Sequence, residues 1–209
     1  MAQLKAIVAS EALQSQPSNL YPIYKYSPGI DADVHRAYLK VANLNDKSRG
    51  PSFILESAHN GDTVDRYTFI GINPRKVIQT GDNAEKFAPE LCNVDPITVL
   101  EAEMKKYNQY QLPGIPKLSG GAVGYVSYDC VKYCEPKTKR PLKDVLQVPE
   151  AVLLMCDLII CYDSEYRRFQ IINNIQIAPG TSEADIVSRF ETAAREINDV
   201  EKLLTASPA

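Results

Sequence analysis

Apolar and polar residues alternate over several short stretches of the chain, with the period of two that is typical of β-strands. Turn sequences such as Asn73-Pro74 and Asp163-Ser164 separate these stretches. The pattern predicts strands over residues 21–26, 52–58, 66–72, 75–80, 121–128, 151–162 and 169–177. We expect the last two of these to pair with one another across Asp163-Ser164.

Apolar residues recur at helical spacing in three other segments. The first helix is predicted over residues 34–42, with Asp31 as a candidate N-cap. The second begins at Asp95-Pro96, an N-cap followed by a first-turn proline, and continues to Tyr107. The third is a long amphipathic helix over residues 186–204, for which Ser182 and Asp185 form a capping box.

The order of these elements favours an α+β fold with largely antiparallel sheets and flanking helices. Strands joined by turns outnumber helices, and no regular β-α alternation is present. Residues 1–18 are expected to form a loose leader, and residues 19–209 one α+β region. The Pro- and Lys-rich segment 135–149 is expected to be a loop that crosses between two sheets.

The composition excludes several classes of protein. The net charge of -3 gives no reason to expect a polyanionic partner, so no nucleic acid is expected. No apolar run reaches membrane-spanning length. Five Cys do not form a disulfide framework, and with two His in the chain a zinc site is poorly supported. Reduced thiols in a cytoplasmic protein fit this pattern best.

The glycine-rich sequence Gly120-Gly121-Ala122-Val123-Gly124 is compatible with a phosphate-binding loop or with close packing in a strand. A phosphate loop requires a following helix N-terminus, whereas Tyr125 and its neighbours favour a strand. We therefore expect these glycines to permit close backbone packing or a bulge. Tyr125 and Tyr128 are three residues apart on the predicted strand, so at least one of them is expected in the core.

The stretch Phe53-Ile54-Leu55-Glu56-Ser57-Ala58 is the most informative in the chain. An apolar run stops at a carboxylate and a hydroxyl, and Arg66 follows across a short connection. An acceptor, a hydroxyl and a cation at a strand end are able to hold a zwitterion such as an amino acid. The alternative is an ordinary strand end with a solvated Glu56 and a turn-forming Ser57.

Four segments together resemble the large subunit of anthranilate synthase, fungal type. Residues 53–58 are similar to its "LLES" element, and residues 66–75, Arg-Tyr-Thr-Phe-Ile-Gly-Ile-Asn-Pro-Arg, to the segment that follows it. Residues 118–129 are similar to its "GG-hydrophobic-GY-x-x-YD" element, and residues 135–144 to a connection of the fungal branch. The resemblance runs from about Tyr21 to Val200 and covers the N-terminal portion of that subunit. The chain therefore corresponds to a piece of a longer protein or to a natural short form.

The resemblance implies a role in a lyase that converts chorismate and glutamine (or ammonia) to anthranilate and pyruvate in tryptophan biosynthesis. It implies a separate glutaminase subunit as partner and L-tryptophan as allosteric feedback inhibitor. Leu55, Glu56 and Ser57, with Arg66 nearby, are the implied tryptophan-binding residues. Arg66 departs from the pattern of family members that carry Lys near this point, although either cation balances the carboxylates. The catalytic residues and the Mg²⁺ site of the family belong to its C-terminal part, so this chain is expected to hold no cofactor and no catalytic residue.

Two other hypotheses remain open from the sequence. The first is the corresponding region of aminodeoxychorismate synthase, an enzyme of folate synthesis, which the fit of residues 118–144 makes less favoured. The second is a free-standing domain that binds a small molecule or docks a glutaminase. Since apolar faces that pack against a missing part would be exposed, self-association of the chain is also expected.

Overall fold

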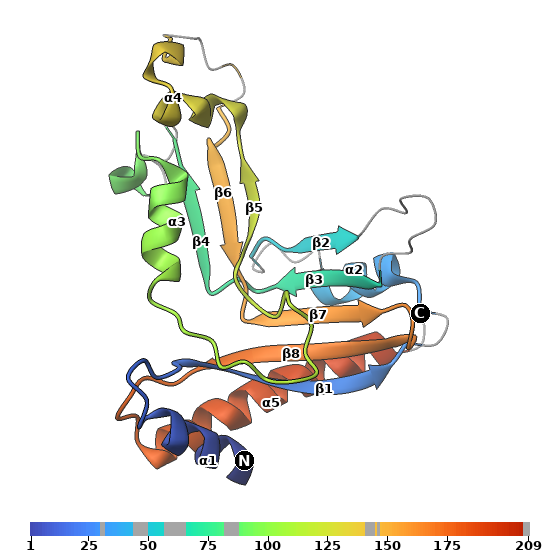
Figure 1. Cartoon of the computed structure of the whole chain (residues 1–209). Helices are drawn as coiled ribbons and strands as arrows, with labels where there is room; N and C mark the ends of the chain where they lie inside the picture. Colours follow the sequence, from blue (N-terminus) through green and yellow to red (C-terminus); the bar gives the residue numbers. More distant parts are fainter. Residues whose placement is uncertain are drawn as a thin grey trace. The chain divides into compact units, whose positions relative to one another are not determined.

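The computed structural model describes residues 1–29, 32–43, 50–56, 66–81, 88–140, 145 and 147–206. The helices are α1 (Ala2–Glu11), α2 (Val34–Ala42), α3 (Pro96–Met104), α4 (Val131–Cys134) and α5 (Glu183–Thr205), with 3₁₀ turns η2 (Pro89–Leu91), η3 (Tyr128–Cys130) and η4 (Pro136–Thr138) (Figure 1). The strands are β1 (Leu20–Pro28), β2 (Phe53–Glu56), β3 (Tyr67–Ile72), β4 (Lys76–Thr80), β5 (Ala122–Val126), β6 (Ala151–Met155), β7 (Leu158–Asp163) and β8 (Arg168–Gln176).

These strands form two sheets, and every pair of neighbouring strands is antiparallel. One sheet has the order β1-β8-β7-β3-β2, and the other has the order β4-β6-β5. The predicted α+β class with largely antiparallel sheets is therefore confirmed. The chain divides into two compact units, unit 1 (1–74, 107–120 and 156–209) and unit 2 (75–106 and 121–155), where we expected one region.

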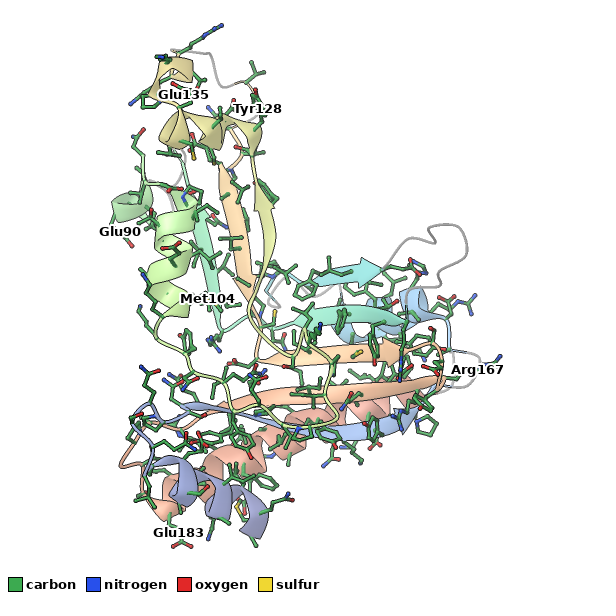
Figure 2. All side chains as sticks on the ribbon, in the orientation of Figure 1. Glu90, Met104, Tyr128, Glu135, Arg167 and Glu183 are labelled. Atoms are coloured by element: carbon green, nitrogen blue, oxygen red, sulfur yellow. The ribbon has the colours of Figure 1, made fainter. Side chains whose placement is uncertain are left out.

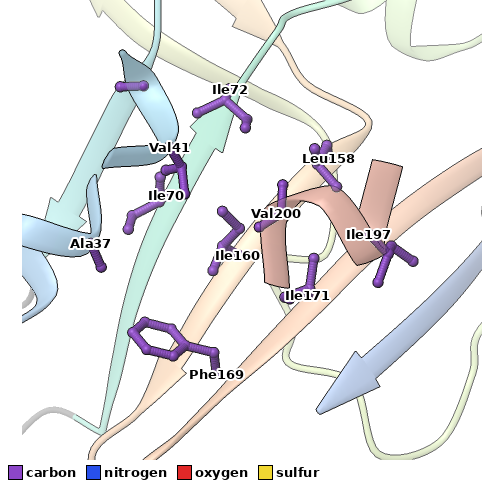
Figure 3. Close-up of a cluster of buried hydrophobic side chains, with 11 residues drawn as sticks. Ala37, Val41, Ile70, Ile72, Leu158, Ile160, Phe169, Ile171, Ile197 and Val200 are labelled. Carbon is purple, nitrogen blue, oxygen red and sulfur yellow. The ribbon is translucent and has the colours of Figure 1, made fainter. Parts of the chain in front are cut away.

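The core of unit 1 lies between one face of the five-stranded sheet and helices α2 and α5 (Figure 3). Ile70, Ile160 and Ile171 come from three neighbouring strands and are fully buried on this face. Val41 from α2 and Val200 from α5 pack against them. Helical spacing gives α2 and α5 one apolar face each, and alternation gives the strands another. Burial of these faces against one another holds the layers together.

The opposite face of this sheet is crossed by the segment 107–120. The carbonyl oxygen of Gly114 accepts hydrogen bonds from Gln170 Nε2 at 3.1 Å and Tyr26 Oη at 3.4 Å. Further along, Asn174 Nδ2 donates to the carbonyl oxygen of Ser119 at 2.6 Å. Gln170 and Asn174 are four residues apart on β8 and therefore lie on the same face, away from Ile171.

Residues 1–18 do not form the loose leader that we expected. Residues 2–11 form α1, and Leu4 is buried against Tyr21 and Ile186. The end of the helix is fixed by Glu11, whose Oε2 accepts from Ser18 N at 3.2 Å and Ser18 Oγ at 2.6 Å. The prediction failed because the apolar residues of this helix are not gathered on one face, and their partners lie elsewhere in the chain.

The predicted strand 151–162 is two strands in two different sheets. β6 ends at Met155 and β7 begins at Leu158. Between them, the carbonyl oxygen of Asp157 accepts from Asn174 N at 3.0 Å and Asn174 Nδ2 at 3.1 Å, a partner that periodicity does not reveal. The predicted pairing across Asp163-Ser164 is confirmed for β7 and β8.

Three predictions concern the glycine-rich strand and the segment that follows it, and the first of them is confirmed. A Cβ on Gly124 would lie 1.8 Å from the carbonyl oxygen of Val152, which confirms that this glycine permits close backbone packing. The segment after β5 does not cross between sheets, because β5 and β6 are neighbours in one sheet.

Tyr125 and Tyr128 are 45% and 88% exposed, so neither is in the core, where we had expected at least one; Figure 2 labels Tyr128. β5 is an edge strand that ends at Val126, and Tyr128 belongs to the following 3₁₀ turn.

The helix signals are largely confirmed. Asp95 caps α3 by accepting from Ile97 N at 3.0 Å, and Ser182 Oγ caps α5 by accepting from Asp185 N at 3.1 Å. The observed cap of α2 is Asp33, whose Oδ1 accepts from Arg36 N at 3.1 Å. Asp31, the predicted cap, lies outside the described residues.

Candidate functional site

The candidate site is built at the end of β2, an edge strand of the five-stranded sheet. Leu55 pairs with Phe69 and Glu56 pairs with Thr68 of β3. Because side chains alternate along a strand, Leu55 and Glu56 point to opposite faces of the sheet. Leu55 is 41% exposed on the face away from the helices, and the exposed Glu56 lies on the helix-covered face. Ser57 lies outside the described residues.

Helix α2 brings an imidazole to the Glu56 carboxylate. His35 Nε2 lies 3.0 Å from Glu56 Oε2, and His35 Nδ1 lies 3.9 Å from Asp33 Oδ1 at the start of the same helix. Asp33 caps the start of α2, and Ala37, one turn further along the helix, packs into the core. These two contacts fix the position of His35, which lies between them. The imidazole is therefore held between two carboxylates, one of which belongs to the candidate site.

Arg66 is joined to the hairpin between β7 and β8. Arg66 Nε donates to Asp163 Oδ1 at 2.9 Å and Arg66 Nη2 donates to Asp163 Oδ2 at 2.7 Å, a bidentate pair. Arg66 Nη1 lies 2.7 Å from Glu165 Oε2. Among the described residues, no ion pair joins Arg66 to Glu56. The structure thus brings His35, and not Arg66, to the carboxylate of the candidate site.

The guanidinium of Arg66 also lies between two aromatic rings. Its Cζ is 5.0 Å from the centre of the Tyr67 ring and 4.9 Å from that of Tyr166. The stack continues through Arg168, whose Cζ is 4.7 Å from the centre of the Tyr166 ring and 3.8 Å from that of Tyr26. Cation–π contacts of this kind add to the ion pairs in holding the side chain.

The backbone of Arg66 is held by the same hairpin. Its carbonyl oxygen accepts from Ser164 N at 2.9 Å and Ser164 Oγ at 3.0 Å. The Asp163 carboxylate in turn accepts from Glu165 N at 3.1 Å and Tyr166 N at 3.3 Å, which shapes the turn. Figure 2 labels Arg167, which follows in this turn with a φ of 47°.

Burial raises the pKa of Asp163, but the hydrogen bonds from Arg66 and from the Tyr166 backbone outweigh burial, so the net pKa lies below its usual value. In the unfolded chain the carboxyl returns to an ordinary pKa of about 3.9. Asp163 therefore contributes stability above about pH 4 that is lost as the pH falls toward its folded-state pKa.

As the pH is lowered from 5 through about 3.9, the ordinary pKa of the unfolded carboxyl, toward the lower folded-state pKa, we expect the free energy of unfolding of the Asp163→Asn variant to fall less than that of the wild type. Urea denaturation at a series of pH values measures this difference. Glu191→Gln, on the exposed surface of α5, is the control and should follow the wild-type pH profile. Equal pH profiles for wild type and Asp163→Asn would contradict the assignment of the low pKa.

Other chemistry has little support in the described part of the chain. No group of three or more His, Cys, Asp or Glu side chains is placed there to hold a metal ion. None of the described helices is both long enough and apolar enough to span a bilayer. All five Cys are free thiols, and burial raises the pKa of Cys161 to about 12.

The sequence located the strand end but not its partners. Leu55 and Glu56 lie where the apolar run predicted the end of β2. His35, Asp163 and Glu165 were missed as members of the site. Asp163 was recognised as a turn residue, but its pairing with Arg66 depends on β3 lying beside β7, which no local pattern signals.

Two fungal proteins are similar in sequence to this chain over most of its length. No family model matches the chain. Anthranilate synthase component 1 of Saccharomyces cerevisiae is 50% identical over 188 residues, which are 90% of this chain and 35% of that protein. A probable anthranilate synthase component 1 of Schizosaccharomyces pombe is 37% identical over 93% of this chain and 36% of that protein. The crystal structure of anthranilate synthase component I from Streptococcus pneumoniae covers 73% of this chain and 32% of that chain, with a TM-score of 0.47 and 18% identity.

The chain thus spans about a third of the length of the curated relatives that it matches. The match covers both units, since it extends over 188 and 194 residues in the two fungal relatives. Over this length, the chain is similar to component 1 of anthranilate synthase.

Proposed function

We propose that this chain is the tryptophan-sensing region of the large subunit of an anthranilate synthase. The complete enzyme would convert chorismate and glutamine, or ammonia, to anthranilate and pyruvate. The observation that carries this proposal is the 50% identity over 90% of the chain to a protein named anthranilate synthase component 1. The chain would sense the end product of the pathway, and the reaction would take place in the part of the subunit that this chain does not match.

The geometry at the end of β2 supports an amino acid as the ligand. The exposed carboxylate of Glu56 is suited to an ammonium group, and the half-exposed Leu55 to an indole ring. Because these two side chains point to opposite faces, a ligand that contacts both must lie across the strand end. Ser57, the next residue, would complete the hydrogen bonding of the ammonium group.

Inhibition would follow from a difference in affinity between two states of the complete subunit. Tryptophan that binds the inactive state better shifts the population toward that state, by no more than this difference in affinity. The reaction would then slow without any contact between tryptophan and chorismate. The Mg²⁺ used by the family would be held by the part of the subunit that carries the reaction.

A glutaminase subunit is the proposed protein partner, and the cytoplasm is the proposed location. The relatives that support the partner are named as component 1, which implies a further component. Neither aminodeoxychorismate synthase nor a free-standing binding domain is favoured, since the matched relatives carry the anthranilate synthase name. The product of the complete enzyme, anthranilate or aminodeoxychorismate, distinguishes the first of these.

The test measures L-tryptophan binding to the complete subunit by calorimetry, for wild type, Ser57→Ala and Glu56→Gln. A hydrogen bond to a charged group contributes about 1.5–3 kcal/mol, so each variant should weaken binding about tenfold or more. Ser188→Ala and Glu191→Gln, both on the exposed surface of α5, are matched controls that should bind as the wild type does. If both site variants keep wild-type affinity, the strand end does not bind tryptophan and the proposal is wrong.

A further inference from the structure

We infer that Arg66 is a positioning residue of this site: clamped by Asp163, it fixes the strand that carries the site and does not bind the carboxylate of the ligand. The inference rests on the proposed function, because it concerns the same amino-acid ligand. It runs against the simplest interpretation of the sequence, in which a cation near Glu56 and Ser57 pairs with the ligand's carboxylate.

The charge around Arg66 argues against a third carboxylate. Each of its three guanidinium nitrogens already faces a carboxylate oxygen, two of Asp163 and one of Glu165. Within this trio, the one positive charge of Arg66 is already matched by two negative charges. A ligand carboxylate placed there would be repelled, and it would compete for donors that are already engaged.

Releasing the guanidinium from Asp163 would also be costly. The Asp163 side chain is 8% exposed, so departure of its partner would leave a buried carboxylate without its ion pair. The rings of Tyr67 and Tyr166 lie close to the same guanidinium and would lose their cation–π contacts. Binding energy from a small ligand would have to offset these losses before any affinity remained.

Backbone pairing connects the Arg66–Asp163 ion pair to β2, the strand that carries Glu56. Tyr67, the residue after Arg66, pairs with Asp163, and Thr68 pairs with Glu56. The hydrogen bonds from Ser164 to the Arg66 carbonyl oxygen fix the first residue before β3. A shift at this point would move β3, and with it the carboxylate of Glu56.

The experiment compares L-tryptophan with L-tryptophanamide, which keeps the ammonium group and lacks the carboxylate. Affinities for the complete subunit are measured by calorimetry for wild type, Arg66→Met, Arg66→Lys and Asp163→Asn. A positioning role predicts that Arg66→Met and Asp163→Asn weaken both ligands by the same factor, about 2- to 30-fold, the range found for mutations outside a binding site. Arg66→Lys should restore little, because one ammonium group cannot reproduce the bidentate pair.

A direct contact between Arg66 and the ligand carboxylate predicts a different pattern. Arg66→Met would then weaken tryptophan and leave the amide unchanged, and Asp163→Asn would tighten tryptophan by freeing the guanidinium. Either result overturns the inference. Glu165→Gln, at a side chain that is 60% exposed, provides the same comparison with less risk to folding, and tighter tryptophan binding in this variant also overturns it.

Failure of the proposed function gives another outcome. In that case Ser57→Ala and Glu56→Gln leave tryptophan affinity unchanged. The inference about Arg66 fails alone when those two variants weaken binding as expected and the Arg66 and Asp163 variants show the pattern of direct contact.

Discussion

Ile160→Ala is expected to lower the free energy of unfolding by about 2–5 kcal/mol, the range for truncation of a fully buried aliphatic side chain. Ile160 has no exposed surface and lies on β7, the middle strand of the five-stranded sheet. It pairs with Ile70 on one side and Ile171 on the other, and both are fully buried. The cavity would therefore open where surrounding strands have little freedom to close it. Urea denaturation, with an unchanged slope between variants, measures the loss.

Ile97→Ala is the matched control. Ile97 is 47% exposed on α3, and alanine has the higher helix propensity, so the same chemical change should cost little there. A loss for Ile160→Ala no larger than that for Ile97→Ala would show that the sheet face is not the core of unit 1. The difference between the two variants is the informative quantity, because effects on the unfolded chain are similar for the two.

Gly124→Ala is expected to destabilise unit 2 by about 1–3 kcal/mol or more, the cost of overpacking at a site that cannot yield. The added Cβ would meet backbone atoms, with the Val152 carbonyl oxygen at 1.8 Å and Leu153 Cα at 2.9 Å. A side chain could rotate away, but these atoms belong to the neighbouring strand. We expect β5 to separate from β6, which amide hydrogen exchange in Ala151–Met155 would report as faster exchange.

Gly50→Ala is the control for this change. Among the residues that the structure describes, the atom nearest to its added Cβ is Pro74 Cδ at 3.4 Å, an ordinary contact distance. Its φ is not in the left-handed region, so no backbone strain is added. Wild-type exchange rates in β6 of the Gly124→Ala variant would contradict the close packing of the two strands.

Local signals in the sequence were sufficient for most elements. Helix α5 carries a Ser182 cap and a continuous apolar stripe, and it was predicted almost to the residue. A strand was predicted over residues 52–58 from their apolar run, and β2 lies there at Phe53–Glu56. The prediction failed for α1, where the local signal was weak. It also failed at Asp157, where a distant hydrogen-bond partner overrides the local pattern.

The candidate site divides in the same way. Glu56 was found because a carboxylate ends an apolar run, which is visible over a few residues. The partner of Arg66 was not found, because Asp163 is 97 residues away and reaches it only through the pairing of β3 with β7. His35 was missed because a histidine on the polar side of a helix carries no sign of the strand beside it.

The division of the chain into two units has a consequence for dissection of the protein. The chain passes between the units after Pro74, Lys106, Gly120 and Met155, and both termini belong to unit 1. Unit 2 is therefore made of two separate segments, and neither unit can be expressed as one uninterrupted stretch of the gene. A protease cut at any one of these crossings would leave the units covalently joined through the others.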